Sequence, residues 1–191
     1  TLQNVQPTLI GNGLGWNKIM HNWNGLIDDV RVYGQALTTT EVVGLYQAGR
    51  EIYKDVPLSA PVPREGLLVH YTFDAEPRDG IVVDDSGNGH AAQVKGARWV
   101  PNAEGGGVYD FSGQGDAHIL ADWQFLNGAR SYSMTAWARH FGDDNTWDLV
   151  IGPALPDDNR GPGLLWLNRR QEGYNAASNV NIKRDSDGQL E

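Results

Sequence analysis

Carboxylate and amide side chains gather in two short stretches of the chain. DDSGNG contains Asp84 and Asn88 around two glycines, and GLIDDV contains Asp28 and Asp29. Glycines permit a tight loop whose carbonyls turn inward, and Ca²⁺ takes about six to eight oxygen ligands of these kinds. The same residues are typical of a turn held by its own side-chain hydrogen bonds. Because neighbouring strand residues point to opposite faces, Asp28 and Asp29 are not expected to act together, and both interpretations stay open.

Aromatic rings form a second candidate set, since the chain has 7 tryptophans in 191 residues. Exposed indole rings can serve as stacking platforms for sugars, with amide and carboxylate groups nearby to bind hydroxyls. Trp16, Trp123 and Trp147 stand beside polar turn residues and are therefore the candidate ligand-binding residues. Trp137 and Trp166 lie within apolar stretches, which predicts that they belong to the core.

No pattern typical of an enzyme is found in the sequence. Retaining glycosidases place two carboxylates about 5 Å apart, which on one strand face needs a pattern such as Glu-x-Asp-x-Glu, and the glutamates never form it. The 5 histidines show no metal-binding spacing, and no nucleophile elbow, P-loop or dinucleotide-binding glycine pattern is present. The sequence therefore predicts a protein without catalysis.

Composition excludes several kinds of partner. The net charge is −9 and no block of Lys or Arg occurs, so nucleic acid and anionic membrane surfaces are poor partners. There are no cysteines, which excludes disulfides and cysteine-based zinc sites. No apolar run approaches the roughly 20 residues of a membrane span. The chain starts within a pattern, without Met or a signal peptide, and we interpret it as a fragment or a processed product.

The elements that must position these residues are short strands. With 24 Gly, 9 Pro and 40% hydrophobic residues, regularly spaced strands and Gly-rich turns predict an antiparallel sandwich. One helix is expected near residues 39–48, because Thr38 and Glu41 have the spacing of a capping box. Its apolar face is expected to comprise Val42, Val43, Leu45 and Tyr46.

A proline-rich stretch divides the chain. Pro57, Pro61 and Pro63 lie close together and favour extended backbone over helix. The sequence therefore predicts a linker at residues 51–65, between a segment at 1–50 and a segment at 66–191.

Both segments contain motifs of one known family. GLIDDVRVYGQAL, followed by EVVGLY, resembles the C-terminal signature of LamG-like, concanavalin A-like jelly-roll domains. LLVHYTFD, VVDDSGNGHAAQVKGARWV and GVYDFSGQGDAHIL resemble the N-terminal signature, and SYSMTAWAR is similar to the central strand. The resemblance implies an all-β fold, an antiparallel jelly-roll β-sandwich with one short helix.

The motifs stand in the reverse of the family's order. Either residues 1–50 close one repeat and residues 66–191 open the next, or the domain is circularly permuted. In both cases the strand Leu26–Tyr33 is predicted to pair antiparallel with Leu67–Phe73, in the same chain or in another copy. Pairing between copies would give head-to-tail self-association.

The resemblance also carries expectations about function. It implies a Ca²⁺ site in many members, with the positions of Asp84 and Asp28 as ligands and Asn88 nearby, whereas Asp116 reads as a turn residue. It implies a non-catalytic extracellular or cell-surface module, often in large bacterial proteins, that binds a glycan or a surface protein. Two other functions stay open: a structural repeat of a surface filament or sheath, and the targeting module of a polysaccharide-degrading enzyme.

Overall fold

The computed structural model describes most of the chain. The described residues are 7–12, 14–15, 18–19, 22–49, 61–103, 105–113, 115–122, 126, 129–141, 147–153, 164–170 and 173–179. Their strands are β1 (Thr8–Ile10), β2 (Leu14–Gly15), β3 (Lys18–Ile19), β4 (Gly25–Tyr33), β5 (Leu67–Tyr71), β6 (Ile81–Val82), β7 (Ala92–Lys95), β8 (Arg98–Pro101), β9 (Gly107–Asp110), β10 (His118–Ala121), β11 (Ser133–His140), β12 (Trp147–Pro153), β13 (Leu164–Arg170) and β14 (Gly173–Asn179). The described helix is α1 (Thr39–Ala48).

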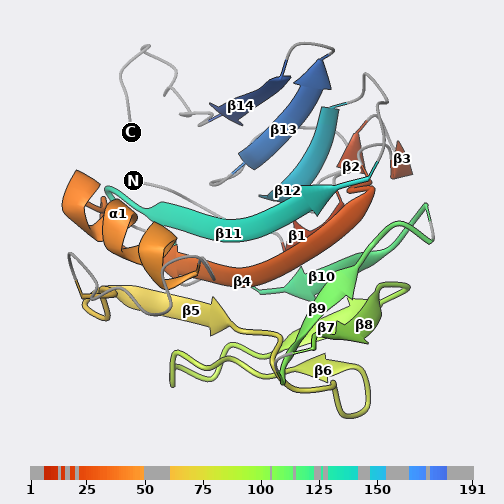
Figure 1. The fold of residues 1–191 in the computed structure, drawn as a ribbon, viewed down its shortest axis with the longest axis horizontal. Helices are drawn as coiled ribbons and strands as arrows, with labels where there is room; N and C mark the ends of the chain where they lie inside the picture. The colour runs from red at the N-terminus through yellow and green to blue at the C-terminus, as the bar shows by residue number, and fades with distance from the viewer. Residues whose placement is uncertain are drawn as a thin grey trace, which may run out of the picture.

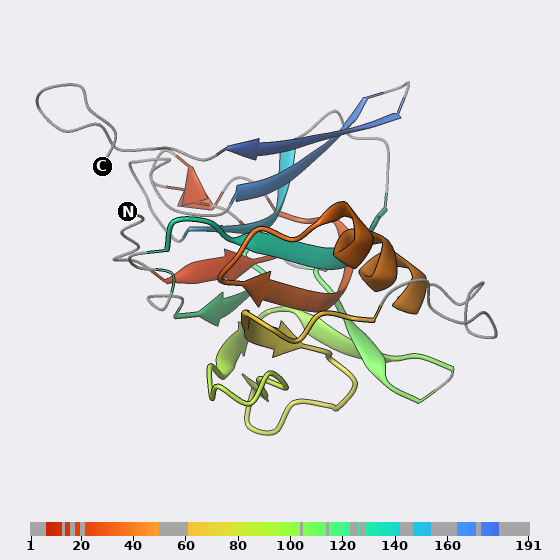
Figure 2. The same ribbon diagram turned by 90° about the vertical axis from the view of Figure 1, so that its left-hand side faces the viewer.

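The strands form two antiparallel sheets, which confirms the prediction of an all-β sandwich. One sheet has seven strands in the order β14-β13-β12-β1-β10-β7-β6. The other has five strands, with β11-β4-β9-β8 in order and β5 also paired to β4. The short strands β2 and β3 pair with each other. Figure 1 shows both sheets, and Figure 2 shows α1 on the side of the five-stranded sheet that faces away from the seven-stranded sheet.

Strand β4 is the centre of the five-stranded sheet. It pairs with β11 along one edge, and with β5 and β9 along the other. The pairing of β4 with β5 aligns Val32 with Val69 and Val30 with Tyr71. The predicted pairing of these two strands is therefore confirmed, and it occurs within the chain.

The N-terminal segment supplies a central strand to the other sheet too. Strand β1 lies between β10 and β12, with Leu9 opposite Leu120 on one side and Gly152 on the other. The strand order thus interleaves the segment at 1–50 with the segment at 66–191. The predicted linker falls mostly at residues 51–60, outside the described residues, and the division into segments stays a prediction. At the end of this stretch, Tyr33 donates a hydrogen bond to the Pro63 carbonyl at 3.2 Å.

Apolar side chains from both sheets meet between the layers. The five-stranded sheet contributes Ile27, Val30 and Val32 from β4 to a core cluster that also holds Ile10 and Ile119 of the seven-stranded sheet. These five side chains are fully buried. Burial of apolar area is the main favourable term in folding, so this interface fixes which face of β4 points outward.

The helix begins as the sequence predicts. Thr38 accepts a hydrogen bond from the Glu41 N–H, and the Glu41 carboxylate accepts one from the Thr38 N–H, which completes the capping box. The predicted apolar face is wrong, however. Leu45 is buried, whereas the exposed fractions of Val42, Val43 and Tyr46 are 48%, 41% and 44%. A short helix on the outside of a sheet needs to bury only a narrow stripe, and here that stripe contains Gly44 and Leu45.

Candidate functional site

Asp28 and Asp29 project from the same face of β4, so the expectation that they point to opposite faces is wrong. The register between β4 and β11 shifts at this point. Thr135 and Trp137 of β11 have one residue between them, whereas their partners in β4, Arg31 and Asp28, have two. Asp29 has the left-handed backbone conformation, with φ at 51°. An extra residue in one strand is a β-bulge, which resets the alternation of faces.

The burial pattern follows this bulge. Ile27 and Val30 are buried in the core, and the two aspartates between them are half-buried on the outer face. Asp is among the few residues that tolerate the left-handed conformation, because its short side chain can bond locally. The bulge therefore gathers polar groups that a regular strand would divide between the two faces.

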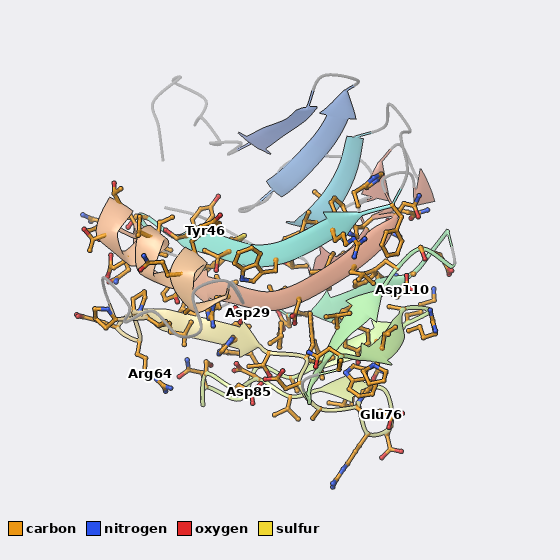
Figure 3. All side chains as sticks on the ribbon, viewed as in Figure 1. Asp29, Tyr46, Arg64, Glu76, Asp85 and Asp110 are labelled. Carbon is orange, nitrogen blue, oxygen red and sulfur yellow. The ribbon has the colours of Figure 1, made fainter. Side chains whose placement is uncertain are left out.

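An open cavity of about 530 Å³ lies on this outer face. Strand β4 contributes three side chains, β5 and the residues after it three more, β11 an indole and the end of α1 a glycine. The lining residues are Asp28, Asp29, Arg31, Gly49, His70, Thr72, Asp74 and Trp137. Figure 3, viewed onto this face, shows Asp29 on β4 and Tyr46 on α1. The volume falls within the roughly 300–1,000 Å³ of small-molecule sites.

Asp29 is held by two basic groups. Its carboxylate is 2.6 Å from Nη1 of Arg31 and 2.7 Å from Nε2 of His70. The side chains of Asp29 and Arg31 are 18% and 13% exposed, so this ion pair is shielded from water more than an ordinary surface pair. Because both basic groups contact Asp29, neither forms a direct ion pair with the neighbouring Asp28.

Asp28 is the carboxyl group with the most perturbed acidity in the cavity. Burial raises its pKa to about 7, and the nearby charges of Asp29 and Asp74 act in the same direction. A hydrogen bond from the Asp29 N–H at 2.8 Å and the charge of Arg31 act against this rise. At neutral pH the group therefore exists in both forms, and it can either donate or accept a hydrogen bond.

Trp137 forms the aromatic wall of the cavity, so the prediction that it belongs to the core is wrong. It stands opposite Asp28 in the register, on the outward face of β11. Its ring is half-buried and stacks on Tyr46 of α1, with the ring centroids 5.7 Å apart and the planes 28° apart. The sequence pattern around Trp137 was apolar because Met134 and Ala136 pack against the core from the opposite face.

Asp84 and Asn88 hold a turn. Asp84 is buried and accepts hydrogen bonds from the N–H groups of His70, Ser86 and His90 and from the Ser86 hydroxyl. Burial alone would raise the pKa of Asp84, but these four bonds together keep it below its usual value. The Asn88 amide donates to the carbonyls of Leu67 and Leu68.

The contacts of Asp84 favour the turn interpretation. The four donors occupy both carboxylate oxygens of Asp84. Asp28 lines the cavity, whereas Asp84 does not. Within the described ranges, no three His, Cys, Asp or Glu side chains are placed to hold a metal ion. The turn interpretation accounts for these contacts, and calcium binding stays a prediction.

The remaining candidates lie elsewhere. Trp16 and Trp123 fall outside the described residues, and for Trp147 the structure describes the backbone in β12 but not the side chain. Asp116 lies in a turn and pairs with the exposed Lys95 at 3.2 Å.

Sequence reasoning missed most of the cavity lining, although one signal was present. Apolar residues in GLIDDVRVY recur at Ile27, Val30 and Val32. The first step of three residues breaks the two-residue period of a regular strand. That break marks the bulge and, with it, the shared face of Asp28 and Asp29.

Comparisons of the chain with models of protein families, with curated proteins and with solved structures found no match. The LamG-like resemblance therefore stays a prediction. No helix in the described part of the chain is long and apolar enough to cross a membrane.

Proposed function

We propose that this chain is a non-catalytic extracellular module of the LamG-like kind, and that the cavity on its outer face binds a glycan. One observation carries the proposal: a partly exposed indole and several hydrogen-bonding side chains line the same cavity. An aromatic face can stack on a sugar ring while carboxyl, guanidinium and hydroxyl groups bind its hydroxyls. The β-sandwich and the pairing of β4 with β5 support the family assignment.

The charge of the lining favours a neutral glycan. Three carboxyl groups face one Arg and one His, and Asp29 binds both basic groups. A sulfated or uronic-acid glycan would therefore enter a region of negative potential without a free cation to receive it. A neutral sugar needs only hydrogen-bond partners, which Asp28 and Thr72 supply.

The contacts of Asp29, the carboxylate next to Asp28, favour binding over hydrolysis. A raised pKa such as that of Asp28 is also a property of general acids. Glycoside hydrolysis needs a second carboxylate to act as a nucleophile or base, and the adjacent Asp29 is bound to Arg31 and His70. Those contacts engage one carboxylate oxygen each, so Asp29 serves as the partner of two basic groups.

The two other functions differ in their support. A filament in which one copy completes the next requires strands exchanged between copies, whereas β4 finds its partners β5, β9 and β11 within its own chain. A targeting module of a polysaccharide-degrading enzyme would use the same cavity in the same way. The two functions therefore share the same binding site, and they differ only in the kind of protein to which the module is attached.

Titration calorimetry with a panel of hexasaccharides tests the proposal. The panel comprises neutral hexasaccharides of glucose, mannose, galactose and xylose, together with a heparin hexasaccharide. We expect at least one neutral sugar to bind, and the sulfated one to bind more weakly. Asp28→Asn and Trp137→Phe are expected to weaken the strongest interaction about tenfold, which corresponds to roughly 1.4 kcal/mol.

The matched control is Asp79→Asn, which makes the same chemical change at an exposed aspartate outside the cavity. It is expected to leave the affinity unchanged. Absence of binding across the neutral panel would refute the glycan proposal, and so would equal losses in Asp28→Asn and Asp79→Asn. Release of shorter sugars from the bound hexasaccharide would refute the absence of catalysis.

A further inference from the structure

Gly49, which ends helix α1, is not required by the backbone. Its φ and ψ are −87° and −2°, a right-handed conformation that any residue adopts, and its N–H still donates to the Leu45 carbonyl at 3.1 Å. Glycine at a helix end is usually explained by a left-handed conformation that other residues avoid. Here that explanation fails, so another contact must account for the missing side chain.

That contact is with Trp137. A Cβ atom added at Gly49 would overlap the indole at Nε1, Cε2 and Cζ2. The edge of the ring therefore lies directly on the backbone where the helix ends. Because protein interiors are close-packed, one added methyl group has to displace either the indole or the last turn of α1.

Tyr46 contacts the same indole from one turn earlier in α1. The two rings stack with centroids 5.7 Å apart, and residues three apart in a helix lie on the same side. Tyr46 thus covers one face of the Trp137 ring while Gly49 receives its edge. Together they confine the indole in two directions, and the ring in turn lines the cavity with Asp28.

We propose that Gly49 and Tyr46 are positioning residues, which hold the Trp137 indole where it serves as the wall of the glycan site. The inference rests on the proposed function, since it concerns the same cavity. It assigns to α1 a role in binding through Tyr46 and Gly49, although Val42 and Val43 of the same helix are exposed and do not line the cavity. The site is then built from both segments of the chain, because α1 and β4 come from residues 1–50 and β5 and β11 come from residues 66–191.

The test compares two glycine-to-alanine variants. Gly49→Ala adds a methyl group against the indole, whereas Gly113→Ala adds the same group where nothing lies within 4 Å and the backbone φ is not positive. The protein is labelled with 5-fluorotryptophan, and the Trp137 signal among the 7 tryptophans is assigned by its loss in Trp137→Phe. Affinity is measured for the neutral hexasaccharide that binds the wild type most tightly.

We expect Gly49→Ala to shift the Trp137 fluorine resonance and to weaken hexasaccharide binding at least tenfold. Gly113→Ala should change neither. Tyr46→Ala should resemble Gly49→Ala, and Tyr46→Phe, which keeps the stacked ring, should bind like the wild type. Thermal unfolding is recorded for each variant. If Gly49 and Tyr46 only stabilised the fold, the melting temperature of the variants would fall, and Tyr46→Phe would not bind like the wild type.

Two results would overturn the inference while leaving the proposed function intact. One is a shifted Trp137 resonance with unchanged affinity, and the other is an unshifted resonance in Gly49→Ala. If the wild type binds no hexasaccharide, the proposed function fails and the role in binding fails with it. The fluorine spectra then still decide whether Gly49 sets the position of the ring.

Discussion

Asp28 of β4 and Trp137 of β11 are direct cross-strand partners. Residues opposite each other in an antiparallel pair project from the same face, with their Cβ atoms about 5 Å apart. An indole at that distance excludes water from the carboxyl group, and burial is the main cause of the raised pKa of Asp28. The stacking surface and the group of altered acidity are therefore parts of one arrangement, created by the bulge in β4.

The first prediction concerns pH. The pKa of Asp28 is about 7 in the folded protein against an ordinary value of 3.8. Between these values the folded state retains a proton that the unfolded state has released, so stability from this group falls as pH rises toward 7 and then stays constant. Asp28→Asn should therefore be more stable than the wild type at pH 8.5, by on the order of 1 kcal/mol after solvent screening.

Urea denaturation of both proteins at pH 3 and pH 8.5 measures this effect. Asn keeps an acceptor for the Asp29 N–H, so the two proteins should be nearly equal at pH 3, where the Asp28 carboxyl is neutral in both states. Because both proteins contain the same other titratable groups, the effects of those groups cancel when the unfolding free energy of the wild type is subtracted from that of the variant. A difference that is the same at both pH values would contradict the raised pKa.

The main strands and the helix could be read from the sequence because their signals are local. Thr38 and Glu41 predict the start of α1 by spacing alone, and the capping box is present. The pairing of β4 with β5 followed from the family resemblance, which was the only source of long-range information. That β1 would lie between β10 and β12 could not be predicted, because a three-residue strand carries no signal about its neighbours.

The candidate site was harder to predict, since it depends on how strands align rather than on what each contains. Trp137 was assigned to the core from its apolar neighbours, yet those neighbours face inward and the indole faces out. Asp28 and Asp29 were separated by a rule that holds only for regular strands. The contact of Gly49 with the indole joins residues far apart in the sequence, and no local pattern reports it.

The second prediction tests the bulge. A left-handed conformation costs most residues about 1–2 kcal/mol, but Asp and Asn tolerate it. Asp29→Asn and Asp29→Ala both remove the charge that pairs with Arg31 and His70, and they differ in their tolerance of φ at 51° and in the hydrogen-bond acceptor that Asn keeps. Asp29→Ala should therefore be less stable than Asp29→Asn by about 1 kcal/mol in urea denaturation. Equal stabilities would show that this conformation is not populated.

The third prediction concerns the loop around Asp84. Asp84→Ala leaves the N–H groups of His70, Ser86 and His90 without their acceptor, and each buried unpaired group costs about 1–3 kcal/mol. We expect a loss on the order of 3 kcal/mol. Asp85→Ala is the matched control, because Asp85 is exposed and accepts its short bond from Thr72. Comparable losses in both variants would contradict a specific role for Asp84.

The fourth prediction concerns calcium. An ion that binds only the folded state at a hundredfold excess over Kd stabilises it by about 2.7 kcal/mol. Since four donors occupy the oxygens of Asp84, the turn interpretation predicts the same melting temperature in millimolar CaCl₂ and in EDTA. A rise in CaCl₂ that disappears in Asp84→Ala would instead establish the calcium site that the family resemblance implies.

The fifth prediction is that residues 61–191 do not fold without residues 1–50. Deletion removes β1, which joins β10 to β12, and β4, which joins β11 to β5 and β9. It also removes Ile10, Ile27, Val30 and Val32 from the core. The truncated chain should lack dispersed amide signals in NMR spectra, and it should show no cooperative thermal transition.

Cutting the chain without removing anything is the control for this deletion. A protease site placed within residues 51–60 breaks the same covalent connection, but it leaves β1 and β4 in the sample. Because the strands of residues 1–50 are paired on both sides by strands of residues 66–191, the nicked halves should stay together through gel filtration and retain the intact spectrum. Pairing within the chain also leads us to expect a monomer in sedimentation equilibrium. A folded truncated chain would show that the N-terminal strands are dispensable, whereas a concentration-dependent dimer or fibre would favour the exchange of these strands between copies.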